Sequence, residues 1–329
     1  MKLASLNKGR DGQLIVVSKD LATYAKASHI ALTMQNAIEN WEDVLPKLQS
    51  LYKGLNNGNV ESHPFNVADV ASPLPRAYQW LDGSAYVKHV ELVRKARGAE
   101  LPESFWQDPL MYQGGSDTFL APTGDIPFVD NTWGLDYEAE VTVVTDDVPL
   151  GTKAENMAEH IKLIMLVNDV SLRGLTKDEL AKGFGFMQSK PSSAFSPVAV
   201  TPDELSDSWN DGKVNLPLYS YINGEEYGRP NAGIDMVFNF YQLIEHAAKS
   251  RNLGAGTIVG SGTIANLSDD VSKGTNVGSS CLAERRMLET IIGKPVTPWM
   301  QPEDSIRIEM LDDKGSNIFG SIEQTVKQI

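Results

Sequence analysis

The spacing of hydrophobic residues at the start of the chain predicts a small α/β unit. Lys2–Leu6 and Leu14–Val17 are predicted strands, separated by a polar turn rich in Gly and Asp. Hydrophobic residues then recur at helical spacing from Ile38 to Leu55. Because proline lacks an amide hydrogen and crowds the preceding turn, Pro46 is expected to kink or divide this helix.

A change of pattern near Val70–Pro75, which is punctuated by Pro and Ser, predicts a domain boundary. We therefore expect a cap domain at residues 1–73 and a second domain at residues 74–329. Few helices and long irregular loops in the second part favour a β-rich α+β fold.

The elements predicted in the second domain are mostly strands. A dense run of β-branched residues predicts a strand at Glu140–Thr145, and a long hydrophobic run predicts one within His160–Leu172. An Asn-Gly pair predicts a hairpin within Tyr219–Tyr227. Alternation of hydrophobic residues predicts strands from Ile306 through Ile318 to Ile322. A short helix at Ala154–Glu159 is expected to precede the hydrophobic run. The clearest helix is Asn239–Ser250, where Asn239 and Gln242 are placed as a capping box.

Charge and cysteine content narrow the class of protein. The 329 residues carry a formal net charge of −14 and contain no extended basic stripe, which argues against a nucleic-acid partner. No hydrophobic stretch reaches the roughly 18 residues typical of a membrane span. The single cysteine, Cys281, allows no internal disulfide and no cysteine-rich zinc site, so a cytoplasmic protein is expected.

Several acidic residues form a pattern that solubility does not explain. In a strand, Glu138 and Glu140 would face the same side with their Cα atoms about 6.6–6.8 Å apart, close enough to share one cation. An exposed edge with two glutamates is the alternative. Asp169 follows the long hydrophobic run, where an unpaired carboxylate is costly to bury. Arg173, four residues later, offers a simple ion pair as the other interpretation.

Two further segments carry candidate chemistry. His89 follows Asp82 by seven residues and could act as a general base, although an isolated histidine is often structural. Lys190 ends a glycine-containing loop that lacks the spacing of a nucleotide-binding P-loop. Taken singly, none of these signals decides between a functional and a structural role.

In combination, the residue types and their order resemble the fumarylacetoacetate hydrolase family. The resemblance covers roughly residues 74–326 and is strongest to compact bacterial two-domain members. It rests on Asp82 and His89, the Glu138-x-Glu140 pair, Asn168-Asp169 with Arg173 four residues beyond Asp169, Arg97-Gly98, Tyr112, Lys190, Gly262-Thr263 and the late Glu284.

The resemblance implies a fold, a metal and a set of roles. The fold would be a β-rich C-terminal domain, a mixed β-roll, with a small N-terminal α/β cap. One Mg²⁺ or Ca²⁺ ion would be bound by Asp82, Glu138, Glu140 and Asp169. Catalytic roles would fall to His89, Glu284, Arg173 and Lys190, and substrate contacts to Ser84, Arg97, Tyr112, Gln188 and Thr263. A homodimer is implied as well.

The activity implied is hydrolysis of a carbon–carbon bond in a small anionic diketo acid. The first expectation is cleavage of 4-fumarylacetoacetate to fumarate and acetoacetate, in tyrosine and phenylalanine catabolism. Ser84 and Thr176 stand where longer animal members carry Tyr and Gln, and Gln188 is a possible substitute for that Gln. These departures keep acylpyruvate hydrolysis, oxaloacetate decarboxylation and keto–enol isomerisation open. A catalytically silent scaffold is a third hypothesis.

Overall fold

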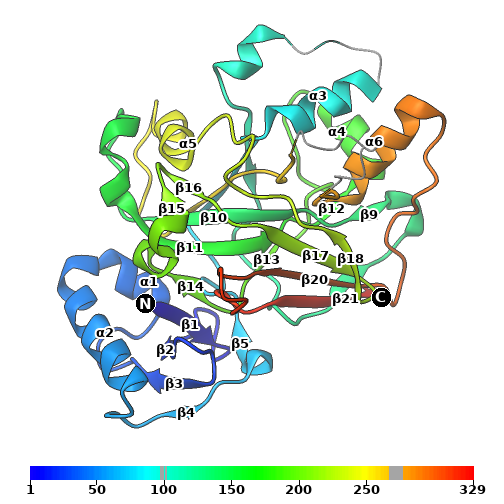
Figure 1. The fold of residues 1–329 in the computed structure, drawn as a ribbon. Helices are drawn as coiled ribbons and strands as arrows, with labels where there is room; N and C mark the ends of the chain where they lie inside the picture. Colours follow the sequence, from blue (N-terminus) through cyan, green and yellow to red (C-terminus); the bar gives the residue numbers. More distant parts are fainter. Residues whose placement is uncertain (97–99, 101, 267–276) are drawn as a thin grey trace.

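The computed structural model describes residues 1–96, 100, 102–266 and 277–329. They form a small N-terminal unit joined to a larger, β-rich body (Figure 1). The N-terminal unit contains strands β1 (Lys2–Leu6), β2 (Gln13–Val17), β3 (Thr23–Lys26), β4 (His63–Pro64) and β5 (Val70–Ala71) and helices α1 (Met34–Glu39) and α2 (Trp41–Asn56). The α+β class predicted from the sequence is confirmed.

The N-terminal unit is a small sheet with helices packed on one face, drawn in blue in Figure 1. Strands β1 and β2 pair antiparallel with Ser5 opposite Leu14, which confirms both predicted strands. Helix α2 buries Trp41 and Leu48 in a cluster that also contains Leu14. This burial matches the helical spacing of hydrophobic residues in the sequence.

The prediction that Pro46 divides this helix is wrong. Helix α2 runs through Pro46, and the break lies earlier, at Asn40, which separates α1 from α2. Pro46 lies in the second turn of α2, so it removes only the one backbone hydrogen bond that its own nitrogen would make. Packing of the hydrophobic face, including Trp41 and Leu48, offsets that loss.

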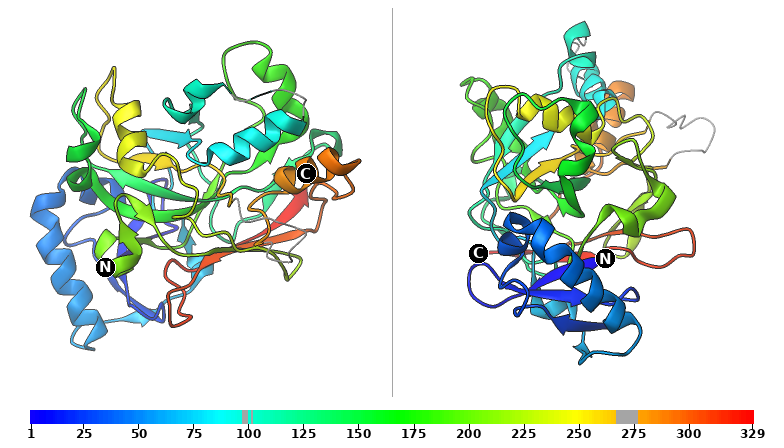
Figure 2. Two further views of the ribbon diagram at one scale, coloured as in Figure 1. Left: turned by 45° about the horizontal axis from the view of Figure 1, so that its top comes forward. Right: turned by 90° about the vertical axis from the view of Figure 1, so that its left-hand side faces the viewer.

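The larger body is built on one long mixed sheet and a second, smaller sheet (Figures 1 and 2). The N-terminal strands extend the long sheet, because β1 pairs with β14 through Lys2 and Val200. The long sheet runs in the order β4-β3-β2-β1-β14-β11-β10-β19-β6-β7. Its strands in the body are β6 (Gln79–Gly83), β7 (Met111–Gly114), β10 (Ala139–Thr145), β11 (Ile161–Asn168), β13 (Ala194–Phe195), β14 (Ala199–Val200) and β19 (Thr257–Gly260).

The second sheet has the order β18-β17-β20-β21-β8. Its strands are β8 (Ile126–Phe128), β17 (Leu218–Ile222), β18 (Glu225–Gly228), β20 (Ser305–Met310) and β21 (Ile322–Gln328). The hairpin at Asn223-Gly224 is confirmed, and both residues have positive φ, as a tight hairpin turn requires. Ile318 lies before β21 rather than in a strand.

Helices and short ribbons complete the body. They are α3 (Val87–Ala96), α4 (Arg173–Leu180), α5 (Phe240–Ala247), α6 (Leu282–Ile292), and the strand pairs β9 (Leu135–Asp136) with β12 (Ser171–Leu172) and β15 (Trp209–Asn210) with β16 (Lys213–Val214). The capping box at Asn239 and Gln242 is confirmed, although α5 ends three residues before Ser250. The expected turn before the hydrophobic run is a pair of 3₁₀ helices, Ala154–Asn156 and Ala158–His160.

The central strands are buried on both faces, which explains their continuous hydrophobic sequences. Every residue of β10 and β11 is buried. Strand β11 ends at Asn168, so Asp169 emerges directly from the buried strand, as predicted. Next to β10, strands β19 and β6 pair in parallel with Gly260 beside Asp82. The sheet therefore brings acidic residues of separate segments to one region.

Among the described residues, no helix combines the length and the hydrophobicity that crossing a bilayer would require.

Gly260 lies so close to Asp82 that a larger residue cannot be accommodated without movement. A Cβ atom there would lie 2.4 Å from Asp82 Oδ1 and 2.6 Å from Trp80 Cη2. We predict that Gly260→Ala lowers the free energy of unfolding by about 1–3 kcal/mol, the usual cost of overpacking a buried site. Gly254→Ala is the matched control, because its Cβ would contact nothing within 4 Å. Equal midpoints of urea unfolding for the two variants would contradict the prediction.

Candidate metal centre and active site

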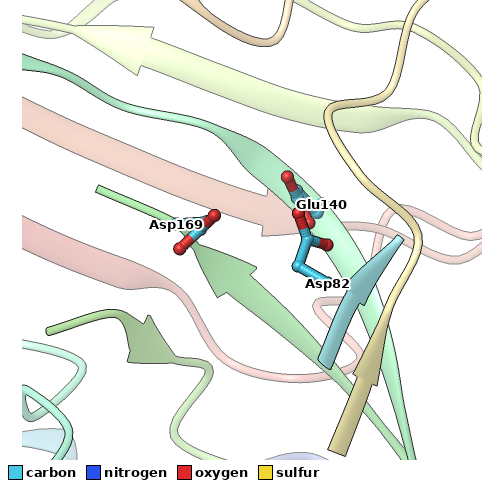
Figure 3. A group of neighbouring side chains, drawn as sticks. All are labelled: Asp82, Glu140 and Asp169. Carbon is cyan, nitrogen blue, oxygen red and sulfur yellow. The ribbon is translucent and has the colours of Figure 1, made fainter. Parts of the chain in front are cut away.

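Three buried carboxylates from separate segments meet in the part of the long sheet formed by β11, β10, β19 and β6. Asp82 lies in β6, Glu140 in β10, and Asp169 directly after β11. Figure 3 shows their side chains directed toward a common point. One carboxylate oxygen from each lies within 4.8 Å of the other two, and all three residues are buried. This spacing suits a single ion held between them.

Glu140 provides the clearest sign that this group of carboxylates suits a cation. Neither of its carboxylate oxygens receives a hydrogen bond from any described residue, and both are buried. Burial, followed by the charges of Asp82 and Asp169, raises the pKa of Glu140 well above its ordinary value. Burial and the charge of Asp169 raise the pKa of Asp82 in the same way. A buried carboxylate without a donor is costly unless a cation compensates its charge.

Glu138 was expected to share the ion with Glu140, but its carboxylate is hydrogen-bonded to two cationic side chains. Its Oε1 accepts a hydrogen bond from Arg173 at 2.6 Å, and its Oε2 accepts one from Lys190. Ser171 also donates to Oε2 at 3.2 Å. Although burial opposes ionisation, Arg173 and Lys190 hold the pKa of Glu138 below its ordinary value. The structure thus brings three of the four expected ligands into one group, with Glu138 beside it.

Arg173 does not form the simple ion pair with Asp169 that its position in the sequence suggested as an alternative. Its Nε instead donates to Asp136 at 2.9 Å, and its other contact is Glu138. Asp136 also accepts hydrogen bonds from the backbone amides of Leu282 at 2.7 Å and Ala283 at 3.0 Å. Asp136 and Arg173 therefore connect the start of α6 to the site.

Lys190 and Tyr112 complete the surroundings of Asp169. Lys190 Nζ lies 2.5 Å from Asp169 Oδ2, and the Tyr112 hydroxyl donates to the same oxygen at 2.7 Å. Ser193 donates to Oδ1 at 2.8 Å. Burial disfavours the charge of Lys190, but the carboxylates of Asp169 and Glu138 outweigh it and raise the pKa of Lys190. The lysine is therefore held as a cation within the site.

His89 and Glu284 lie side by side on α3 and α6, two helices that contact each other. Glu284 is buried, and its Oε1 lies 3.8 Å from His89 Nδ1. This distance exceeds a hydrogen bond, and His89 Nδ1 has no hydrogen-bond partner among the described residues. Such a pair is typical of a histidine base with an orienting carboxylate, whose contact often tightens when substrate binds.

These residues line a cavity of about 370 Å³, a volume that suits a small acid. Its walls include Asp82, Gly83, Ser84, His89, Leu110, Met111, Tyr112, Glu138, Arg173, Leu180, Gly185, Phe186, Lys190, Gly262 and Thr263. Among the predicted substrate contacts, Ser84, Tyr112 and Thr263 line it. Gln188 is exposed and is not among these wall residues, and Arg97 lies outside the described residues.

Sequence reasoning missed several residues that the site depends on. Asp136 carried a signal, because it precedes Glu138 by two positions in the same acidic segment. Ser193 and Phe186, in a loop, and Glu179, near the end of α4, carried none, because local sequence does not reveal which distant groups such side chains meet. Phe186 packs edge-on against Tyr112, with ring centroids 5.2 Å apart.

The residues present fit a hard divalent cation. Across the described part of the site, five buried carboxylates face two cationic side chains: Asp82, Asp136, Glu138, Glu140 and Asp169 against Arg173 and Lys190. A divalent ion between Asp82, Glu140 and Asp169 would reduce this excess of negative charge. Oxygen donors of this kind favour Mg²⁺, Mn²⁺ or Ca²⁺.

Two curated proteins with similar sequences carry the names of enzymes, a tautomerase and a hydrolase. Oxaloacetate tautomerase YisK of Bacillus subtilis is 26% identical over 213 residues, which cover 63% of this chain and 66% of that protein. The 2,4-didehydro-3-deoxy-L-rhamnonate hydrolase of Sphingomonas sp. is 26% identical over 159 residues, covering 47% of this chain and 53% of that protein. The chain thus spans about half to two thirds of the length of these relatives.

Solved structures share the whole fold at lower identity. A maleylpyruvate hydrolase from Sphingobium sp. SYK-6, in complex with manganese(II) and pyruvate, superposes with a TM-score of 0.64 at 15% identity. The match covers 100% of this chain and 99% of that one.

Family models account for nearly the entire sequence. Residues 1–76 match the fumarylacetoacetase N-terminal domain 2, and residues 79–327 match the fumarylacetoacetate (FAA) hydrolase C-terminal domain. The β-rich fold and the buried carboxylates Asp82, Glu140 and Asp169 agree with these matches. The chain therefore belongs to the fumarylacetoacetate hydrolase family.

Proposed function

We propose that this protein is a divalent-cation-dependent hydrolase that cleaves a carbon–carbon bond in a small 2,4-dioxo acid of the acylpyruvate type. The observation that carries the proposal is the buried, unpartnered Glu140 carboxylate grouped with Asp82 and Asp169. The half-buried Lys190 and His89, which is paired with Glu284, line the adjacent cavity. The cavity of about 370 Å³ limits the substrate to a small acid.

The side chains around the cavity divide into clear roles. A divalent cation held by Asp82, Glu140 and Asp169 would supply Lewis acidity toward the oxygens of the dioxo acid. Lys190 contributes fixed positive charge at the side of the cavity lined by Tyr112, where its ammonium group contacts Asp169. His89 is placed to accept a proton from water, and Glu284 to stabilise the imidazolium that forms.

The proposed step balances without any further reactant. Water loses a proton to His89, and its oxygen bonds to the acyl carbonyl carbon of the substrate. The bond between that carbon and the neighbouring methylene carbon then breaks, and its electron pair passes into the enolate of pyruvate. Return of the proton to the methylene carbon yields pyruvate and a carboxylic acid.

Keto–enol tautomerisation is the second candidate, because the 26% identical relative from Bacillus subtilis is an oxaloacetate tautomerase. That reaction needs a base but no water. Fumarylacetoacetate, the first expectation from the resemblance, stays a prediction. It is a 3,5-dioxo acid, and its cleavage would release acetoacetate in place of pyruvate. Ser84 lines the cavity, whereas the Thr176 hydroxyl contacts Leu172 O at 3.4 Å. Neither position therefore carries the bulky polar side chain of the longer animal members.

A substrate panel tests the proposal directly. Metal-depleted protein should be inactive, and added Mn²⁺ or Mg²⁺ should restore cleavage of acylpyruvates, followed by loss of the diketone absorbance and by pyruvate release. Oxaloacetate and fumarylacetoacetate belong in the same panel. Tautomerisation of oxaloacetate without cleavage of any dioxo acid would replace the hydrolase assignment with the second candidate.

Replacing His89 should separate catalysis from metal binding. Loss of a general base typically costs about 10²–10⁴-fold in rate, so we expect a fall of this size in kcat for His89→Ala. Mn²⁺ affinity measured by calorimetry should be retained, because His89 is not among the three clustered carboxylates. His63→Ala, in the N-terminal unit, is the control and should keep wild-type kcat. Equal rates for the two variants would exclude His89 as the base.

Glu140→Gln should change stability in opposite directions with and without metal. In metal-free protein the substitution removes one of several mutually repelling carboxylates and adds an amide donor, so Tm should rise. Saturation with Mn²⁺ at about 100 times Kd stabilises the wild type by about 2.7 kcal/mol, and the variant should lose this gain. Exposed Glu155→Gln is the control. A metal-induced rise in Tm that persists in Glu140→Gln would contradict the assignment.

A further inference from the structure

The segment that connects α4 to Lys190 has little packing of its own. Phe184 and Met187 direct their side chains into solvent, with exposed fractions of 99% and 83%. Gly183 and Gly185 adopt positive φ, and a Cβ atom at either would contact nothing within 4 Å. Phe186 packs inward, against Tyr112. Hydrophobic burial therefore does not explain why the end of this segment has a fixed position.

One buried carboxylate holds the end of the segment instead. Glu179, on the last turn of α4, is 7% exposed. It accepts hydrogen bonds from the backbone amides of Met187 at 3.2 Å, Gln188 at 2.6 Å and Ser189 at 2.9 Å. The Ser189 hydroxyl donates to it as well. Burial alone would raise the pKa of Glu179, but the hydrogen bonds from these donors outweigh it and lower the pKa to about 2. The Glu179 carboxylate is therefore charged at all physiological pH values.

The last amide that Glu179 binds, that of Ser189, lies one residue before Lys190. The Ser189 carbonyl accepts a hydrogen bond from the Leu172 amide at 2.8 Å, so Ser189 is fixed from both sides. Lys190 follows, with Nζ bonded to Glu138 and 2.5 Å from Asp169, and 5.3 Å from the centre of the Tyr112 ring. A loss of the Glu179 contacts would release the backbone that carries this ammonium group.

We propose that Glu179 is a positioning residue: its carboxylate binds three consecutive backbone amides and thereby places the Lys190 ammonium between Glu138 and Asp169. The inference rests on the proposed function for the role of Lys190 in the reaction. The contacts of Glu179 themselves are independent of that function. Glu179 belongs neither to the carboxylate cluster nor to the residues that line the cavity, so we infer that it acts through Lys190.

Measurements of kcat and of Mn²⁺ affinity distinguish a positioning role from a general loosening of the fold. A positioning role predicts that kcat falls while Mn²⁺ affinity rises. Glu179→Ala should lower kcat by about as much as Lys190→Met, on the order of 10²-fold for loss of an electrostatic stabiliser. Both variants should bind Mn²⁺ more tightly than the wild type, because the ammonium group competes with the cation for Asp169. A loosened site would bind Mn²⁺ more weakly. Asp178→Asn, the adjacent exposed acid, is the charge-matched control and should change neither quantity.

A double-mutant cycle then tests whether the effect passes through the lysine. If it does, adding Glu179→Ala to Lys190→Met lowers kcat no further and leaves Mn²⁺ affinity at the value of the single variant. Glu179→Gln, which keeps one acceptor oxygen and is the milder change, should lie between the wild type and Glu179→Ala. Additive losses in the cycle, or unchanged kcat in Glu179→Ala, would overturn the proposal.

Hydrogen exchange keeps the inference separate from the proposed function. Peptides covering residues 187–189 should exchange faster in Glu179→Ala than in the wild type or in Asp178→Asn. Wild-type protein that neither binds Mn²⁺ nor cleaves any substrate would refute the proposed function. Even then, unchanged exchange at these amides would overturn the positioning role, and faster exchange confined to them would support it.

Discussion

The repulsion among buried carboxylates is the constraint on which the rest of the site depends. Asp82, Glu140 and Asp169 are buried and lie close enough for their oxygens to share one ion. At low dielectric, such charges cannot stay ionised together without nearby positive charge. Lys190 compensates Asp169 and Glu138, while Glu140 has no compensating donor among the described residues. The site is therefore built around a place for a cation.

The sheet makes this concentration of charge possible. Strands β11, β10, β19 and β6 are successive neighbours, and three of them carry one acidic residue each, in or directly after the strand. Gly260 in β19 leaves room for the Asp82 carboxylate, which its Cβ would otherwise meet at 2.4 Å. Hydrophobic residues that bury both faces of β10 and β11 hold the backbone rigid against the repulsion. Stability from the core thus supports an arrangement that is unfavourable by itself.

Local sequence patterns predicted much of this fold, but they did not predict the hydrogen-bond and ion-pair partners of long side chains. Strands β10 and β11, the Asn223-Gly224 hairpin and the capping box at Asn239 follow from neighbouring residues alone. Alternation within one strand predicted a shared ion for Glu138 and Glu140. Glu138, however, lies just before β10, and its carboxylate contacts Arg173 and Lys190. Nothing in a loop sequence indicates that one glutamate will bind three consecutive amides. Such contacts depend on where distant segments meet, which periodicity does not encode.

The charge balance also explains how an acidic protein with an acidic site could accept an anion. Arg173 is committed to Asp136 and Glu138, and Lys190 is shared between Glu138 and Asp169, so neither has positive charge to spare for a substrate carboxylate. In the described part of the cavity, the carboxylates alone would repel such a group. A divalent cation would remove this repulsion, because it neutralises the negative charge that Arg173 and Lys190 do not compensate. Affinity for an anionic substrate should therefore require the cation first. Lys190 needs a fixed position because it compensates the carboxylates of Glu138 and Asp169 together.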